Sequence, residues 1–134
     1  MEVMSAFFDN FQILICGVIS GFILFQSAIV APAVFQTLPE GQAGPFLRNL
    51  FPKLFKLCAT LMGLNALIAI YFDDLIPACG FILGILLMVF CLLLVPKINN
   101  ARDQNNEPVF KRLHLSTVSS TLIVLLINLW FSLA

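Results

Sequence analysis

Charged residues are scarce in this sequence. Asp, Glu, Lys and Arg make up 10% of the chain, whereas about a quarter of the residues in soluble domains are charged. Mean hydropathy is +1.02, and 60% of the residues are hydrophobic. A chain of 134 residues cannot bury so much apolar surface in a water-soluble core. The composition therefore predicts a single domain that lies in a lipid bilayer.

Apart from Lys56 near the beginning of the second, four long apolar intervals contain no Asp, Glu, Lys or Arg, and this absence excludes classes of function. Proton-driven pumps and transporters carry ionisable groups at membrane depth, so we do not expect one here. The sequence also lacks a catalytic triad, a nucleophile elbow, a P-loop and a dinucleotide-binding fingerprint. We therefore expect no enzymatic activity, no cofactor and no nucleic-acid partner, with the basic residues serving topology and anionic lipid.

The four apolar intervals predict four membrane-spanning helices in one domain, residues 1–134. In an α-helix, about 20 residues cross a hydrocarbon core of about 30 Å. The predicted spans are 11–37, 54–72, 75–95 and 113–133. The predicted fold class is all-α, an integral membrane four-helix antiparallel bundle.

Polar residues between the spans indicate where helices begin. Asp9 and Asn10 are expected to cap the first helix, and the acidic start of the chain is unlike a secretory signal peptide. Only Asp73 and Asp74 separate the second and third spans, which predicts an antiparallel hairpin with Asp74 as a cap. Asn105–Pro108 has the composition of a turn and cap that open the fourth helix.

Prolines mark two further boundaries. Before the second span, residues 46–56 place apolar side chains at helical spacing against basic ones. This pattern predicts a short basic amphipathic segment at the lipid headgroups, and Pro52 is expected to separate it from the span. Pro96 marks the end of the third span, from which the helix is expected to extend through Asn99–Arg102 along the membrane surface.

Basic residues are confined to one side of this predicted bundle. All seven Lys and Arg lie around the beginning of the second span or within Pro96–Ser116. Three acidic residues share that side, which leaves it at +4, whereas the other side carries four acidic residues and is at −4. The positive-inside rule then predicts cytoplasmic basic loops and periplasmic termini in a bacterial inner membrane.

Small and sulfur-containing residues occur inside the spans. The pairs Gly17/Gly21 and Gly80/Gly84 have the small-x-x-x-small spacing that lets helices approach closely. Thiolates and thioethers suit copper(I), but no C-x-x-C spacing is present, and we favour cysteines that act as small hydrophobes. The residues concerned are Cys16, Cys58, Cys79, Cys91, Met62 and Met88.

His114 is the only histidine. It could bind haem or a metal, or carry a proton, although a second axial ligand for haem would have to come from a dimer or a different residue type. We favour a structural histidine that hydrogen-bonds a neighbouring helix or the region of Arg102 and Asp103. These residues and Arg112 crowd one turn. Asp103 is expected to accept hydrogen bonds from one of the arginines on this side of the membrane, Arg48 included, and so fasten the third helix to the fourth.

A polar stripe runs along the fourth span. Its members fall within about 60° of one another at 100° per residue. Polar residues on a spanning helix normally face protein or a water-filled cavity. The stripe consists of His114, Thr117, Thr121, Asn128 and Ser132.

Four motifs occur in a familiar order: F-x-x-x-x-V-A-P-x-x-F at 25–35, L-F-P-K-L-F-K at 50–56, P-K-I-N-N-A-R-D at 96–103 and F-K-R-L-H-x-S at 110–116. Together they resemble the family of small four-helix membrane proteins typified by transmembrane protein 205, whose bacterial members are known only as a domain of unknown function. The resemblance implies fold and topology, but no activity. The positions that it singles out are Pro32, Phe35, Phe51, Pro52, Pro96, Arg102, Phe110, Arg112, His114 and Ser116.

Three functions are compatible with these observations. The first is a non-enzymatic accessory or scaffold subunit that associates with a larger membrane complex, for example a respiratory one, or with itself. The second is a permeation protein for a small solute or metal species, with the polar stripe as its path. The third is a membrane protein that binds haem through His114.

Overall fold

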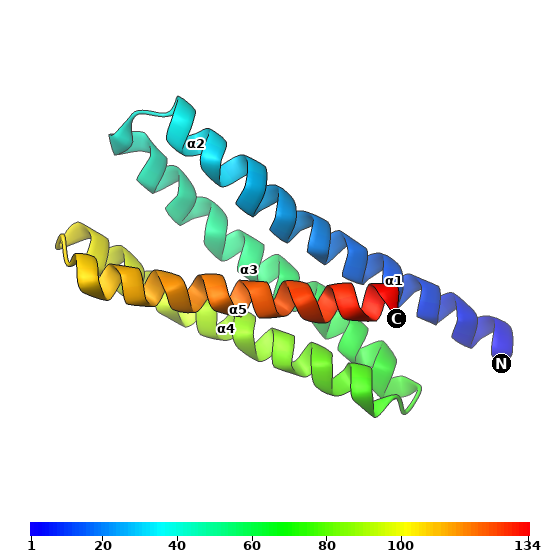
Figure 1. Ribbon diagram of the computed structural model, residues 1–134. Coiled ribbons are helices and arrows are strands. Elements are labelled where there is room, and N and C mark those ends of the chain that lie inside the picture. The colour runs from blue at the N-terminus through cyan, green and yellow to red at the C-terminus, as the bar shows by residue number, and fades with distance from the viewer.

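The computed structural model describes all 134 residues, and the chain is almost entirely helical (Figure 1). Its elements are α1 (Glu2–Phe25), the π-helix η1 (Gln26–Val30), α2 (Ala31–Thr37), α3 (Glu40–Tyr71), α4 (Leu75–Asp103) and α5 (Glu107–Leu133). Because α1, η1 and α2 are continuous, there are four long helices, each long and apolar enough to cross a membrane. The predicted helical membrane bundle is confirmed.

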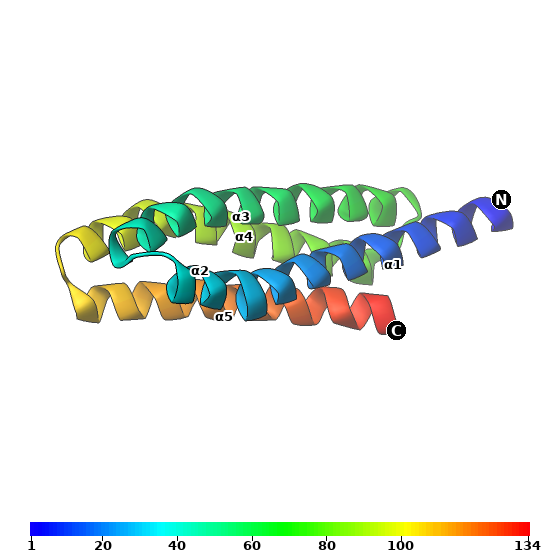
Figure 2. The same ribbon diagram turned by 90° about the horizontal axis from the view of Figure 1, so that it is seen from above.

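The helices run antiparallel, so that the connections fall at two ends of the bundle (Figures 1 and 2). The α2–α3 and α4–α5 connections share one end, which we call the basic end. The two termini and the α3–α4 turn lie toward the other, the acidic end. Helix α3 packs along α4, α4 along α5, and α1 against both α3 and α5, whereas α2 contacts only η1 and α3. The helices at the basic end therefore pack against fewer neighbours than those in the middle of the bundle.

Helix α1 begins earlier than predicted. Asp9 and Asn10 lie inside the helix and do not cap it, because the helix starts at Glu2. Phe8 packs on Phe72 of the α3–α4 turn with their ring centroids 5.5 Å apart. This contact stabilises helical structure in a segment that the sequence-based boundary placed outside the span. Helix α1 also projects beyond the bundle at its acidic end (Figure 1).

Prolines do not interrupt the long helices. The prediction that Pro52 separates an amphipathic segment from the second span is wrong, since α3 is continuous from Glu40 to Tyr71. Leu47 and Phe55 are both buried and flank Pro52 on one apolar face, with Phe51 packed beside them. Their alignment requires an unbroken helix, which offsets the hydrogen bond lost at proline. The extension of α4 past Pro96 is confirmed and reaches Asp103.

The connections follow the local sequence. Asp74 occupies the N-cap position of α4, but its side chain makes no capping hydrogen bond. Asp73 has a φ of 57°, a left-handed conformation that Asp tolerates better than most residues. Asn106 caps α5 as predicted, and its side chain accepts a hydrogen bond from the backbone N–H of Val109.

The two glycine pairs have opposite environments. A methyl group added at Gly80 would overlap the ring of Phe131, and one added at Gly84 would overlap the sulfur of Met62. This pair therefore serves packing inside the chain. Around Gly17 and Gly21, the added methyl would meet nothing within 4 Å, so the α1 pair faces outward.

Candidate functional site

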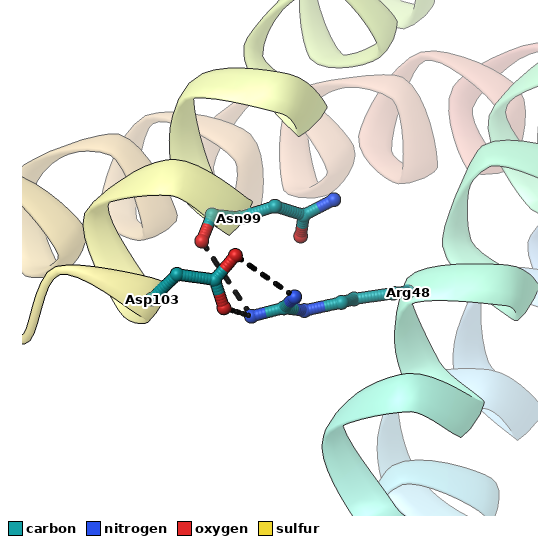
Figure 3. A network of polar contacts seen from close by, with 3 residues as sticks. All are labelled: Arg48, Asn99 and Asp103. Carbon is teal, nitrogen blue, oxygen red and sulfur yellow. Dashed lines mark hydrogen bonds and ion pairs between the residues drawn. The ribbon is translucent and has the colours of Figure 1, made fainter.

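An ion pair joins α3 to α4 at the basic end (Figure 3). The Arg48 guanidinium donates two hydrogen bonds to the Asp103 carboxylate, Nη2 to Oδ1 at 2.6 Å and Nη1 to Oδ2 at 3.3 Å. A third, longer bond of 3.5 Å runs from Nη2 to the backbone carbonyl of Asn99. The planar guanidinium therefore binds both the carboxylate and the last turns of α4, an arrangement that Lys cannot reproduce.

Asp103 accepts hydrogen bonds from an arginine, as predicted, but not where the sequence placed the connection. The expected joint was between the third and fourth long helices, α4 and α5. The partner, Arg48, instead belongs to the second long helix, α3, and holds α3 to α4. The hydrogen bonds from Arg48 lower the pKa of Asp103 from its ordinary value of 3.8. The carboxylate is consequently ionised throughout the neutral range.

A stack of three side chains connects the end of α4 to the start of α5. The Arg102 guanidinium lies over the Phe110 ring, 4.8 Å from its centroid. The His114 ring stacks on Phe110 at a centroid distance of 5.7 Å, with 4° between the planes. This cation–π and stacking arrangement supplies the joint that was expected from Asp103.

His114 itself is exposed, and its side chain makes no hydrogen bond to a neighbouring helix. The hydrogen-bonded role that we favoured for it is therefore wrong, although the residue does brace the turn by stacking. Arg112, next to it in the predicted cluster, is exposed and forms no ion pair. The structure thus brings Arg102, Phe110 and His114 together and leaves Arg112 apart.

Other positions of the sequence motifs have differing environments. Pro32 and Phe35 of α2 are exposed, as is Pro96 of α4. Phe51 stacks on Phe55 with 6.0 Å between ring centroids, and it packs against both buried clusters of the bundle. Ser116 donates to the backbone carbonyl of Arg112. These residues do not form one site.

The polar stripe of α5 is largely turned into the protein. Thr117 and Asn128 are buried, and Thr121 is half-buried. Their donors bond backbone carbonyls of their own helix: Thr117 to His114 at 2.8 Å, Thr121 to Thr117 at 2.7 Å, and Asn128 to Val124 at 2.8 Å. The donors of these three residues are therefore satisfied locally, whereas the buried Asn128 Oδ1 accepts no hydrogen bond from the protein.

Two amides link helices at the centre of the bundle. Gln12 Nε2 donates to the backbone carbonyl of Asn65 at 2.9 Å, and Asn65 Nδ2 donates back to that of Gln12 at 3.3 Å. Asn65 also reaches the thiol of Cys16. Asn128 Nδ2 lies 3.6 Å from the Met62 sulfur. The partner of Asn65 lies 53 residues away in the sequence, so no local pattern contains this contact.

The four cysteines do not gather into one cluster with other acidic, histidine or cysteine side chains. Cys16, Cys58 and Cys91 are buried, and Cys79 is exposed. No three His, Cys, Asp or Glu side chains lie close enough together to hold a metal ion. The Cys91 thiol points at the backbone carbonyl of Thr117, 3.8 Å away. These contacts agree with thiols that fill the core.

Comparisons with known proteins extend over most of the chain. The domain of unknown function DUF4149 matches residues 14–107, a range that contains the Arg48–Asp103 pair and ends as α5 begins. An uncharacterised protein of Aquifex aeolicus (strain VF5) is 29% identical over 105 residues, which cover 78% of this chain and 79% of the relative. No solved structure matches the chain. The comparisons do not confirm the resemblance to transmembrane protein 205. They identify the chain as a member of the DUF4149 family, whose function is unknown.

Proposed function

We propose that this protein is a non-enzymatic membrane subunit that docks a transmembrane helix of another membrane protein on the outer face of α1. The observation that carries the proposal is the contrast between the two glycine pairs. Side chains of the same chain fill the space beside Gly80 and Gly84, whereas the space beside Gly17 and Gly21 is open.

The position of the open pair on α1 supports this reading. The buried residues of α1 follow one seam, which includes Cys16, Ile19 and Ile23. Gly17 and Gly21 lie about 100° and 140° around the helix from Cys16 at 100° per residue. They therefore form a shallow groove away from the core, where another helix could approach closely.

Two alternatives receive less support. Permeation along the polar stripe would need a series of groups free to bind a passing solute, but the donors of Thr117, Thr121 and Asn128 are bonded within α5. Asn128 Oδ1 is the one buried stripe atom without a partner. A haem with two histidine ligands would need a second copy of the chain, because His114 is the only histidine. Its nearest ring partner is Phe110, which cannot bind iron.

Mild-detergent purification followed by native mass measurement tests the docking face. The parent should retain a second membrane protein, and replacing both Gly17 and Gly21 with Leu should release it. The control is Gly63→Leu on α3, which makes the same substitution at one position where an added methyl also meets nothing within 4 Å. A monomeric parent, or equal loss in the control, would refute the proposal, and a retained second copy of this chain would replace the partner with self-association.

We further propose an inner-membrane orientation with the basic end in the cytoplasm and both termini in the periplasm. The distribution of all seven basic residues supports it. Reporter fusions at Ala134 and after Asn105 should lie in opposite compartments. A cytoplasmic reporter at Ala134 would contradict the orientation.

A further inference from the structure

The outer surface of α3 is hollowed near the basic end. Five residues line a cavity of about 400 Å³: Pro45, Phe46, Asn49, Leu50 and Lys53. The wall combines a cation and an amide with apolar surface. Such a mixture suits a ligand that carries both a negative group and a hydrocarbon part.

Lys53 is available to bind an anion from outside the chain. Arg48, one and a half turns earlier on α3, is held by Asp103 in the only ion pair of the structure. Lys53 lies about 140° around the helix from Arg48 at 100° per residue. Lys53 is exposed and pairs with no carboxylate.

The position of the cavity along α3 agrees with the headgroup layer of a bilayer. Lys53 and Asp73 stand near opposite ends of the apolar part of α3, about 20 residues apart. At about 1.5 Å per residue their separation is about 30 Å, which equals the thickness of the hydrocarbon core. If Asp73 lies at one boundary, Lys53 lies at the other, and Phe46 and Asn49 extend one to two turns into the headgroup layer.

We propose that this cavity binds an anionic phospholipid, with Lys53 and Asn49 at its phosphate, Leu50 beside its glycerol and Phe46 beside the outer part of its headgroup. The exposed side chain of Leu57, one turn deeper than Lys53, continues the apolar surface along which a chain would lie. Lysine on a long aliphatic stem reaches from the hydrocarbon boundary to a phosphate. The proposal does not depend on the docking face, because Gly17 and Gly21 belong to another helix.

Native mass spectrometry of the purified protein, titrated separately with phosphatidylglycerol and phosphatidylcholine, tests this site. The parent should bind one phosphatidylglycerol in preference to phosphatidylcholine. Lys53→Gln should weaken that binding about fivefold, the factor that corresponds to about 1 kcal/mol for one basic residue at an anionic surface. The matched control is Lys111→Gln, which removes an exposed charge from α5 outside the cavity. It should leave the affinity unchanged.

Several results would overturn the proposal. Equal weakening by Lys53→Gln and Lys111→Gln would mean diffuse attraction rather than a site. Equal binding of the two lipids would mean that the headgroup charge is not recognised. Displacement of the lipid by millimolar inorganic phosphate would identify a simple anion site. If Lys53→Gln released a copurifying acidic protein but left lipid binding unchanged, the occupant would be a protein.

Discussion

Gly84→Ala should destabilise the bundle, although alanine is the better helix former. The new methyl would overlap the sulfur of Met62, which is fully buried. Overpacking of this kind costs about 1–3 kcal/mol, whereas replacing a mid-helix glycine with alanine gains about 0.5–1 kcal/mol. The net loss should therefore be up to about 2.5 kcal/mol. Gly17→Ala is the matched control, because it makes the same backbone gain in open space.

Unfolding in mixed micelles with a rising fraction of sodium dodecyl sulfate, followed by the fluorescence of Trp130, measures this difference. Gly17→Ala should be at least as stable as the parent and Gly84→Ala less stable. In a Met62→Val background, which shortens the obstructing side chain, Gly84→Ala should cost less, and the double-mutant cycle isolates that contact. If Gly84→Ala proves as stable as Gly17→Ala, the assignment of this glycine to internal packing is wrong.

Other predictions concern the basic end. Arg48→Ala and Asp103→Asn should each increase protease cleavage between residues 96 and 108. The double variant should be cleaved little more than either single variant. Arg112→Ala, which loses no ion pair, is the control and should match the parent. Because the pKa of Asp103 is lowered below 3.8, the stabilisation by its pair should be complete above pH 3.8 and lost as the pH falls through the lowered pKa. A carboxylate titration by NMR, in which Arg48→Ala restores an ordinary pKa, measures this shift, and an unchanged titration would contradict it. Phe110→Leu removes the ring beneath Arg102 and should cost about 0.5–1 kcal/mol, whereas Phe110→Trp should retain stability in the same micelle assay.

Features that depend on neighbouring residues could be predicted from the sequence. Asn106 caps α5 because its side chain needs only the backbone of Val109, three residues away. The α3–α4 hairpin follows from a connection too short for any other arrangement. The extent of the helices was harder to predict, since α1 begins at Glu2 through a contact between Phe8 and Phe72 that no local pattern contains.

Contacts between distant residues could be predicted only in part. Arg48, Arg102 and Arg112 were all candidates for the partner of Asp103, and sequence cannot rank an arginine 55 residues away against one nearby. The buried face of α1 likewise departs from an ideal helical period. The buried residues Cys16, Ile19, Ile23 and Gln26 instead alternate spacings of three and four, the seam of a supercoiled pair of helices. Gln26 is consequently buried, and η1 begins at that residue.

The glycine pairs show why a correct motif does not by itself identify an interface. Both pairs have one spacing, and nothing in the sequence distinguishes them. Helix α4 lies between α3 and α5, so that side chains from both neighbours fill the space that Gly80 and Gly84 leave. Helix α1 meets its neighbours along one seam and turns Gly17 and Gly21 away. Each outward glycine costs about 0.5–1 kcal/mol of helix stability relative to alanine, and no contact inside the chain offsets that cost. This uncompensated cost is the physical reason to look for the occupant of that groove in another protein.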